Sequence, residues 1–249
     1  MLVSLCNEVI AELAFERQCE LAARLGYDGI ELAPFTLGDE PHRLPAAERA
    51  KLRRIAENAG TPIRSLHYLL RAPRGLSITS PDMAQRQRTV AVMRALCEMA
   101  SDLGARVLVH GSPDQRRLEP GDEAAGRERG TASFAAVAEA AEVVRKIGSP
   151  AVKTMIDCSS AALTENESVP DLIRRWLPSD LIGHIHFNDP NRRGPGDGEL
   201  DFAPVLAALR ASGYRHDAAV EPFIYEPDGP TCAARAIAYL RGLRGAQTP

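Results

Sequence analysis

The sequence alternates short apolar runs of strand length with longer stretches of helical periodicity along almost its whole length. This alternation is typical of βαβ units, in which parallel strands form a sheet and the intervening helices cover it. The expected strands are Leu2–Cys6, Gly29–Leu32, Ile63–Tyr68, Val107–His110, Val152–Ile156, Ile182–Phe187 and Ala218–Val220. The sequence therefore predicts an α/β chain with seven parallel strands.

Helical patterns fill most of the intervals between these strands. The helix after the third strand opens at Ser80-Pro81-Asp82, where Ser80 is the expected N-cap, and it ends near Gly104. A polar loop is expected over Asp114–Gly130. The other expected helices are Phe15–Leu25, Pro45–Ala59, Thr131–Ile147, Val169–Trp176, Phe202–Ser212 and Thr231–Leu243.

The length of 249 residues is close to the roughly 250 residues of an eight-stranded parallel βα barrel. The strand pattern leaves room for an eighth strand only between residues 110 and 152, and that stretch reads as a polar loop and a single helix. We therefore predict a TIM-barrel-like parallel (β/α) barrel with seven strands instead of eight, formed by one domain over residues 1–249.

Charge and cysteine content narrow the class of protein. The chain has 30 Lys and Arg against 33 Asp and Glu, which gives a net charge of −3 and no basic excess for nucleic acid or an acidic membrane surface. Its five cysteines are odd in number and contain no Cys-x-x-Cys pair, as expected for reduced thiols. With no signal-peptide pattern in Met1–Ile10, we expect a cytoplasmic protein without a nucleic-acid or membrane partner.

Titratable or polar side chains stand at nearly every predicted strand end. They are Asn7, Glu8, Glu31, His67, His110, Asp157, His186, Asn188, Asp189 and Glu221. In a parallel barrel the carboxyl ends of the strands converge on one mouth, so these groups are expected to gather there. Two carboxylates and an imidazole, from Asp157, Glu221 and His186, suit one Mn²⁺, Mg²⁺, Co²⁺ or Zn²⁺ ion. Such an ion polarises a substrate carbonyl and acidifies the adjacent C–H.

Each of these residues also has a purely structural interpretation. An aspartate at a strand end commonly caps a helix, and His184 or His110 alone is more often a hydrogen-bonded core residue than a ligand. The period of two nevertheless places His184 and His186 on one face of their strand. The loop Arg193–Gly198 lacks the known phosphate-binding patterns, and its glycines also suit a turn. The convergence of many strand ends favours a site.

Several segments together resemble one family. They are Leu5–Ile10, Gly26–Phe35, Ser65–Leu70, Val109–Pro113, Met155–Asp157, His186–Gly196 and Val220–Phe223. The chain resembles the xylose-isomerase-like TIM-barrel superfamily, which includes sugar phosphate isomerases and epimerases, ketose 3-epimerases, hydroxypyruvate isomerase, inosose dehydratase and endonuclease IV. The resemblance covers essentially the whole chain.

The resemblance implies one divalent ion held by Glu, Asp, His and Glu from successive late strands. Asp157, His186 and Glu221 match the last three ligands, and Glu221 also matches an acid/base group. Arg192 matches a substrate-binding arginine. The first glutamate has no counterpart, because the absent βα unit is the one that carries it. Glu142, the nearest acidic residue, falls in a helical pattern and is not assigned as a ligand.

The implied function is a metal-dependent isomerase or epimerase that acts on a small sugar, keto-sugar or polyol by enediolate proton transfer. The resemblance also implies a homodimer. Its expected substrate contacts are Arg192, His67, His110, Glu8, Glu31 and Asn188. A non-catalytic sugar-binding or metabolite-binding descendant is the alternative, because epimerisation needs two acid/base groups and only Glu221 is found.

A third reading is an endonuclease IV-like hydrolase, in which His67 and His110 would be zinc ligands. That enzyme also needs a histidine three residues after the aspartate and another in the glycine-rich loop. Ser160 and the histidine-free stretch Arg193–Gly198 stand at those places. Two imidazoles are therefore absent, and the hydrolase is the least supported reading.

Overall fold

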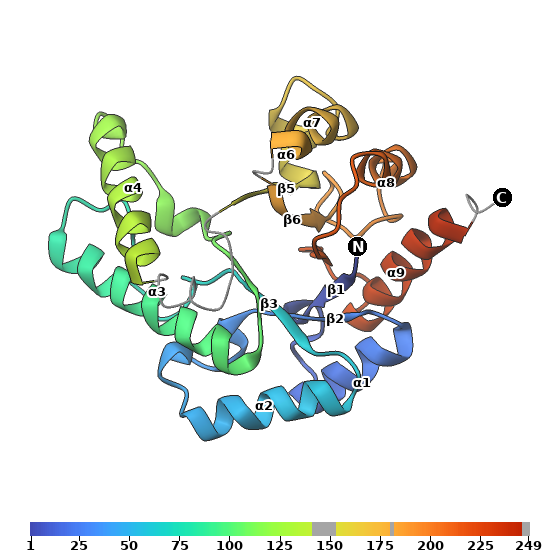
Figure 1. Ribbon diagram of the computed structural model, residues 1–249, viewed down its shortest axis with the longest axis horizontal. Coiled ribbons are helices and arrows are strands. Elements are labelled where there is room, and N and C mark those ends of the chain that lie inside the picture. The colour runs from blue at the N-terminus through green and yellow to red at the C-terminus, as the bar shows by residue number, and fades with distance from the viewer. Residues whose placement is uncertain (141–152, 180–181, 246–249) are drawn as a thin grey trace. The chain divides into compact units, whose positions relative to one another are not determined.

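The computed structural model describes residues 1–140, 153–179 and 182–245 (Figure 1). The chain forms two compact units. The first unit consists of Met1–Glu31, Ile55–Pro62 and Lys153–Pro249, and the second of Leu32–Arg54 and Ile63–Val152. The helix α2 (Ala46–Asn58) contributes residues to both.

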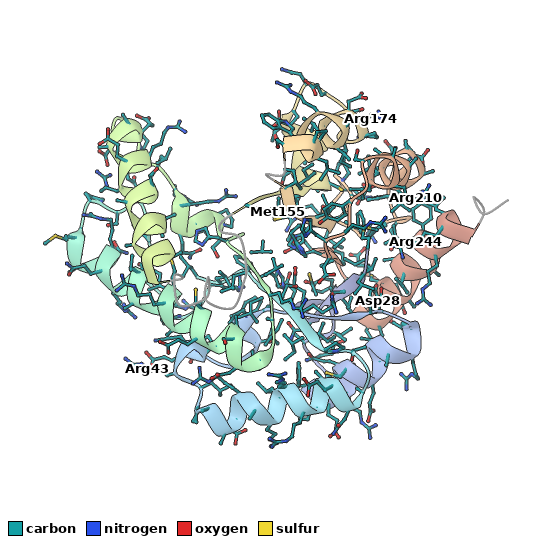
Figure 2. All side chains as sticks on the ribbon, in the orientation of Figure 1. Asp28, Arg43, Met155, Arg174, Arg210 and Arg244 are labelled. Atoms are coloured by element: carbon teal, nitrogen blue, oxygen red, sulfur yellow. The ribbon has the colours of Figure 1, made fainter. Side chains whose placement is uncertain are left out.

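The first unit is built on parallel strands in the order β2-β1-β7-β6-β5. Their bounds are β1 Val3–Cys6, β2 Gly29–Leu32, β5 Thr154–Asp157, β6 Ile182–Phe187 and β7 Ala218–Val220. The register sets Cys6 beside Glu31 and Asp157 beside His186. Asp28, labelled in Figure 2, accepts a hydrogen bond from the backbone N–H of Val3 at 2.8 Å and fixes the start of β1.

Helices flank these strands in the first unit. They are α1 Phe15–Leu25, α6 Cys158–Thr164, α7 Val169–Trp176, α8 Phe202–Ala211 and α9 Gly229–Gly245, with the short 3-10 helices η1 Asn7–Ile10 and η5 Leu177–Ser179. The helix α1 ends at Gly26, which has φ +88° in the left-handed region that glycine adopts without strain. In α7, the Ser168 hydroxyl caps the N-terminus by accepting from the Asp171 N–H. α9 packs against η1, directly after β1.

The second unit contains the parallel pair β3 (Ile63–His67) and β4 (Val107–Val109), in which His67 lies beside Val109. Its long helices are α3 (Met83–Leu103) and α4 (Glu123–Ala140), which pack against each other. Its 3-10 helices are η2 Pro34–Leu37, η3 Pro41–Arg43 and η4 Pro113–Arg116.

All seven predicted strands are present in the described part of the chain, in parallel pairs within each unit. The fifth strand begins at Thr154 and includes Asp157 as its last residue. Glu142, Val152 and the end of the helix predicted over Thr131–Ile147 lie outside the described residues. Among the helices in the described ranges, none combines the length and hydropathy needed to cross a membrane.

Two local predictions were wrong. The N-cap of α3 is Asp82 instead of Ser80, because the Asp82 carboxylate accepts from the Ala84 N–H at 2.9 Å, while the Ser80 hydroxyl accepts from the Asp82 N–H before the helix starts. The expected loop before Thr131 is helical from Glu123 onward. Glycines interrupt the helical pattern of this segment in the sequence. An ion pair between Asp122 and Arg129 spans the first turns of the helix.

Candidate active site

His186, near the end of β6, lies between two carboxylates of the first unit. Its Nδ1 is 2.7 Å from Glu221 Oε2, and its Nε2 is 2.6 Å from Glu31 Oε1. Burial alone would lower the pKa of this imidazole, but Glu221 and Glu31 raise the pKa of His186 well above its ordinary value. Without a bound cation the ring is therefore an imidazolium that donates to both carboxylates.

Glu31, on β2, contacts both His186 and His184. The side chain is fully buried, and its Oε2 lies 2.8 Å from His184 Nε2. Burial would raise the pKa of this carboxyl, but His184 and His186 lower the pKa of Glu31 well below its ordinary value. The His184 and His186 rings meet edge to face at 5.1 Å, which confirms that the two histidines share a face of their strand.

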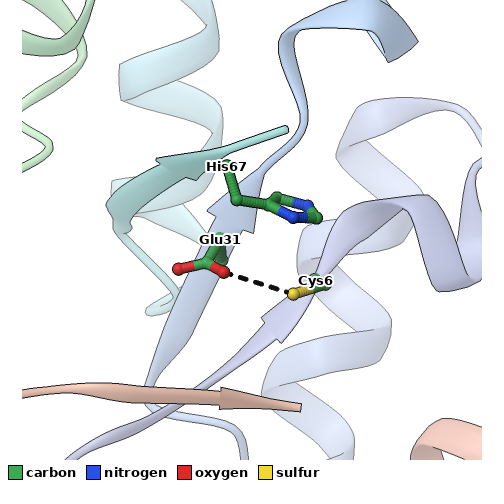
Figure 3. A group of neighbouring side chains, drawn as sticks. All are labelled: Cys6, Glu31 and His67. Atoms are coloured by element: carbon green, nitrogen blue, oxygen red, sulfur yellow. Dashed lines mark hydrogen bonds between the residues drawn. The ribbon is translucent and has the colours of Figure 1, made fainter. Parts of the chain in front are cut away.

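Cys6, the last residue of β1, belongs to the same cluster. The sequence interpretation missed this residue. Figure 3 shows its thiol, which donates to Glu31 Oε1 at 3.4 Å. Among the described residues, Cys6, His186 and Glu221 form a group whose ligand atoms all lie within 4.8 Å of one another. Its position at a strand end is the signal that pointed to the other residues, and it would have identified Cys6 as well.

Asp157 is the last residue of β5, and it has a structural role in addition to its predicted role as a metal ligand. Its Oδ1 accepts from the Ser160 N–H at 2.7 Å and so caps α6, the helix cap expected of an aspartate at a strand end. Its Oδ2 accepts from Asn188 Nδ2 at 2.7 Å and lies 3.9 Å from His186 Nδ1. The side chain is 21% exposed, so a ligand or ion can reach it.

Two of the predicted ligands, Asp157 and Glu221, thus face a nitrogen of the third, His186 Nδ1, from neighbouring strands. Asp157 Oδ2 lies 3.9 Å and Glu221 Oε2 2.7 Å from this atom. One imidazole and two carboxylates are donors that a divalent ion accepts, and an ion on Nδ1 would leave Nε2–H to donate to Glu31. The residues present fit the implied cation.

Asn188 is fully buried, and its amide is committed to this arrangement. It donates to Asp157 and accepts from the Ser159 N–H at 2.9 Å. We expect Asn188→Ala to lower the affinity for Mn²⁺ or Zn²⁺ by about 10–100-fold, because Asp157 loses the donor that orients it. Isothermal titration of dialysed protein measures this, with Asn58→Ala, at an exposed position in α2, as the matched control. Equal affinities in both variants would contradict the prediction.

Arg192 lies in the loop after β6, beside the segment that follows Glu221. It has φ +70°, and its guanidinium stands over the Phe223 ring at 5.9 Å. Its carbonyl accepts from the N–H groups of Phe223 and Ile224. The side chain is exposed, which leaves it accessible to a substrate.

The glycine-rich loop after Arg192 is shaped by a buried carboxylate. Asp189 accepts from the backbone N–H groups of Asn191 and Leu200. A Cβ at Gly198 would lie 2.0 Å from the Asp189 carboxylate, so this glycine is required for close packing. The structure supports the turn interpretation of this loop.

The remaining predicted substrate contacts are Glu8 in the first unit and His67 and His110 in the second. Glu8 lies half-buried in η1, directly after β1. His67 ends β3 and His110 follows β4, on the adjacent strands of the second unit. Their roles toward a substrate stay predictions.

Burial lowers the pKa of His110 to about 4, and Arg116 contributes in the same direction. Between pH 6.5 and about pH 4 the His110 side chain is protonated in the unfolded chain but neutral in the folded chain. We therefore expect wild type to lose up to about 3 kcal/mol of stability relative to His110→Gln between these pH values, and nothing above pH 7. Urea unfolding across this range, with the exposed His216→Gln as control, measures it. A pH-independent difference would contradict the prediction.

A family model described as xylose isomerase-like TIM barrel matches residues 19–137 and 125–243. The chain belongs to this family. The two matched segments overlap at residues 125–137, within α4, in the interval where the sequence predicts a missing βα unit. The family and the TIM-barrel-like fold class are thereby confirmed, with seven strands in the part of the chain that the structure describes.

The named relatives are sugar epimerases. A D-psicose 3-epimerase of Agrobacterium fabrum is 27% identical over 82% of this chain and 78% of its own length. A D-psicose 3-epimerase of Enterocloster bolteae is 38% identical over 35% of this chain, and that match spans 28% of the relative. A crystal structure of a D-psicose 3-epimerase in the presence of D-fructose has a TM-score of 0.76 at 20% identity and covers 98% of this chain and all of that one.

Proposed function

We propose that this protein is a metal-dependent isomerase or epimerase of a small keto-sugar, working by enediolate proton transfer. The observation that carries the proposal is the meeting of Asp157, Glu221 and His186 Nδ1 at the ends of adjacent strands. The sugar epimerases among the relatives support this class of reaction.

A bound divalent cation, held by Asp157, His186 and Glu221, would polarise the carbonyl of the substrate. Glu221 would remove the proton from the carbon next to that carbonyl and return it. Without the cation His186 Nδ1 lies 2.7 Å from the Glu221 carboxylate; with the cation on Nδ1, Glu31 would still hold His186 through Nε2. Glu221 is 7% exposed, and this burial strengthens its interaction with a reacting group.

The number of acid/base groups distinguishes the two reactions within this class. An isomerase moves a proton between neighbouring carbons on one face of the enediolate, and one carboxylate is enough. An epimerase exchanges a proton between opposite faces and needs a second group. We propose that Arg192, His67, His110 and Glu8 contact the substrate. We propose that Glu31 orients His186 and that Asn188 orients Asp157.

A non-catalytic sugar-binding protein is the second candidate. The complete pairing of His186 within the cluster favours it. Both nitrogens of His186 are already paired with carboxylates, so the cluster is satisfied without a cation. Such a cluster would persist as a structural element after catalysis was lost.

Proton exchange separates the two candidates. The protein is dialysed, supplied with Mn²⁺, Co²⁺ or Zn²⁺, and incubated in D₂O with a panel of ketoses and ketose phosphates. We expect deuterium at the carbon adjacent to the carbonyl of at least one sugar, detected by NMR. Sugar binding without deuterium incorporation would support the non-catalytic alternative. The variant with Asp157, His186 and Glu221 all replaced by Ala is the control, and unchanged metal stoichiometry in it would overturn the ligand assignment.

A further inference from the structure

Cys6 is the last residue of β1, which lies between β2 and β7 in the first unit, and it stands at the same end of the strands as the residues of the candidate site. Its register partner on β2 is Glu31. On the other side, Leu5 pairs with Val220, the residue before Glu221. The topology therefore sets Cys6 between the two carboxylates that hold His186.

The surroundings of this thiol differ from those of an ordinary buried cysteine, which is packed among apolar atoms and chemically inert. The Cys6 side chain is fully buried, and Sγ donates to Glu31 (Figure 3). Burial, together with Glu31, Glu221 and Glu8, raises the pKa of the Cys6 thiol well above its ordinary value. Without a cation Cys6 is therefore a neutral thiol in an anionic environment.

We propose that Cys6 is a thiolate ligand of the cation, which joins His186 and Glu221 and biases the site toward Zn²⁺ and Co²⁺. The inference rests on the proposed metal-dependent function. Its geometric basis is that Sγ, an imidazole nitrogen and a carboxylate oxygen of these residues lie within 4.8 Å of one another. On coordination the thiol loses its proton to solvent, because a bound divalent charge stabilises the thiolate.

This ligand set has a chemical consequence for metal choice. Thiolate and imidazole ligands suit Zn²⁺ and Co²⁺, whereas Mn²⁺ and Mg²⁺ prefer oxygen donors. Cys6 would add a sulfur donor to the imidazole of His186 and the carboxylate of Glu221. Among the described residues, the other buried cysteines, Cys19, Cys158 and Cys232, belong to no such group.

Cobalt spectroscopy tests the proposal without relying on activity. Metal-free protein is titrated with Co²⁺, and we expect a sulfur-to-cobalt charge-transfer absorption in the near ultraviolet. Cys6→Ser keeps the size of the side chain and a hydrogen-bond donor to Glu31, so the fold should be retained. In this variant we expect the absorption to disappear and Zn²⁺ affinity to fall by on the order of 10–100-fold, with a smaller loss for Mn²⁺.

The matched control is Cys97→Ser, a half-buried cysteine on α3 in the second unit, which should leave the absorption unchanged. Co²⁺ binding without a sulfur band, or a band that survives in Cys6→Ser, would overturn the role of Cys6 and leave the proposed function standing. Failure of the wild-type protein to bind any of the ions would overturn the proposed metal-dependent function together with this inference.

Discussion

Glu221→Gln should lower the rate of proton exchange into the sugar by about 10²–10⁴-fold, the usual contribution of a positioned acid/base group. The substitution keeps the size and hydrogen-bonding capacity of the side chain but removes the basic carboxylate. It also removes one of the two negative charges beside His186. The measurement is deuterium incorporation by NMR, at saturating metal and sugar, with the unfolding free energy measured in parallel to show that the variant is folded.

Glu226→Gln is the matched control for this experiment. Glu226 lies five residues further along the same segment, is exposed, and pairs with Arg193 at the surface. We expect it to retain the wild-type exchange rate. Exchange in Glu221→Gln at the wild-type rate would show that another group moves the proton, and a variant that binds sugar but exchanges slowly would support the assigned role.

Gly229→Ala should destabilise the protein by about 3 kcal/mol, because its new methyl group meets backbone and not a flexible side chain. Gly229 is the buried first residue of α9, and a Cβ there would lie 1.7 Å from the carbonyl oxygen of Val9. Val9 belongs to η1, which follows Cys6 directly. The helix must therefore move away from η1, and the free energy of unfolding measured in urea should fall.

Gly242→Ala, on the same helix, provides the matched control. A Cβ at Gly242 meets no atom within 4 Å, and the position is inside α9. Replacing glycine by alanine in a helix stabilises it by roughly 0.5–1 kcal/mol. Opposite signs for the two variants are expected, and equal effects would show that the contact between α9 and η1 is not rigid.

The strand pattern was predictable because apolar runs of strand length between helical stretches depend on local sequence. Gly29–Leu32, Ile182–Phe187 and Ala218–Val220 were predicted with their observed bounds. The helix boundaries were less accurate where two capping residues compete, as at Ser80 and Asp82, and where glycines interrupt the pattern, as in α4. The helix α6 was not predicted, because its 7 residues are too few to show helical periodicity.

The sequence by itself determined the order of the strands along the chain, most of the helices, the family, and the set of strand-end residues from which the site is drawn. It could do so because hydrophobic periodicity and residue type are local properties of the chain. Only the tertiary structure decided how these side chains pair. Glu31 and His186 are 155 residues apart in sequence, and their 2.6 Å contact depends on strand register, as does the position of Cys6 beside Glu31. Burial there turns these residues into a coupled cluster, because removal from water strengthens every charge interaction within it.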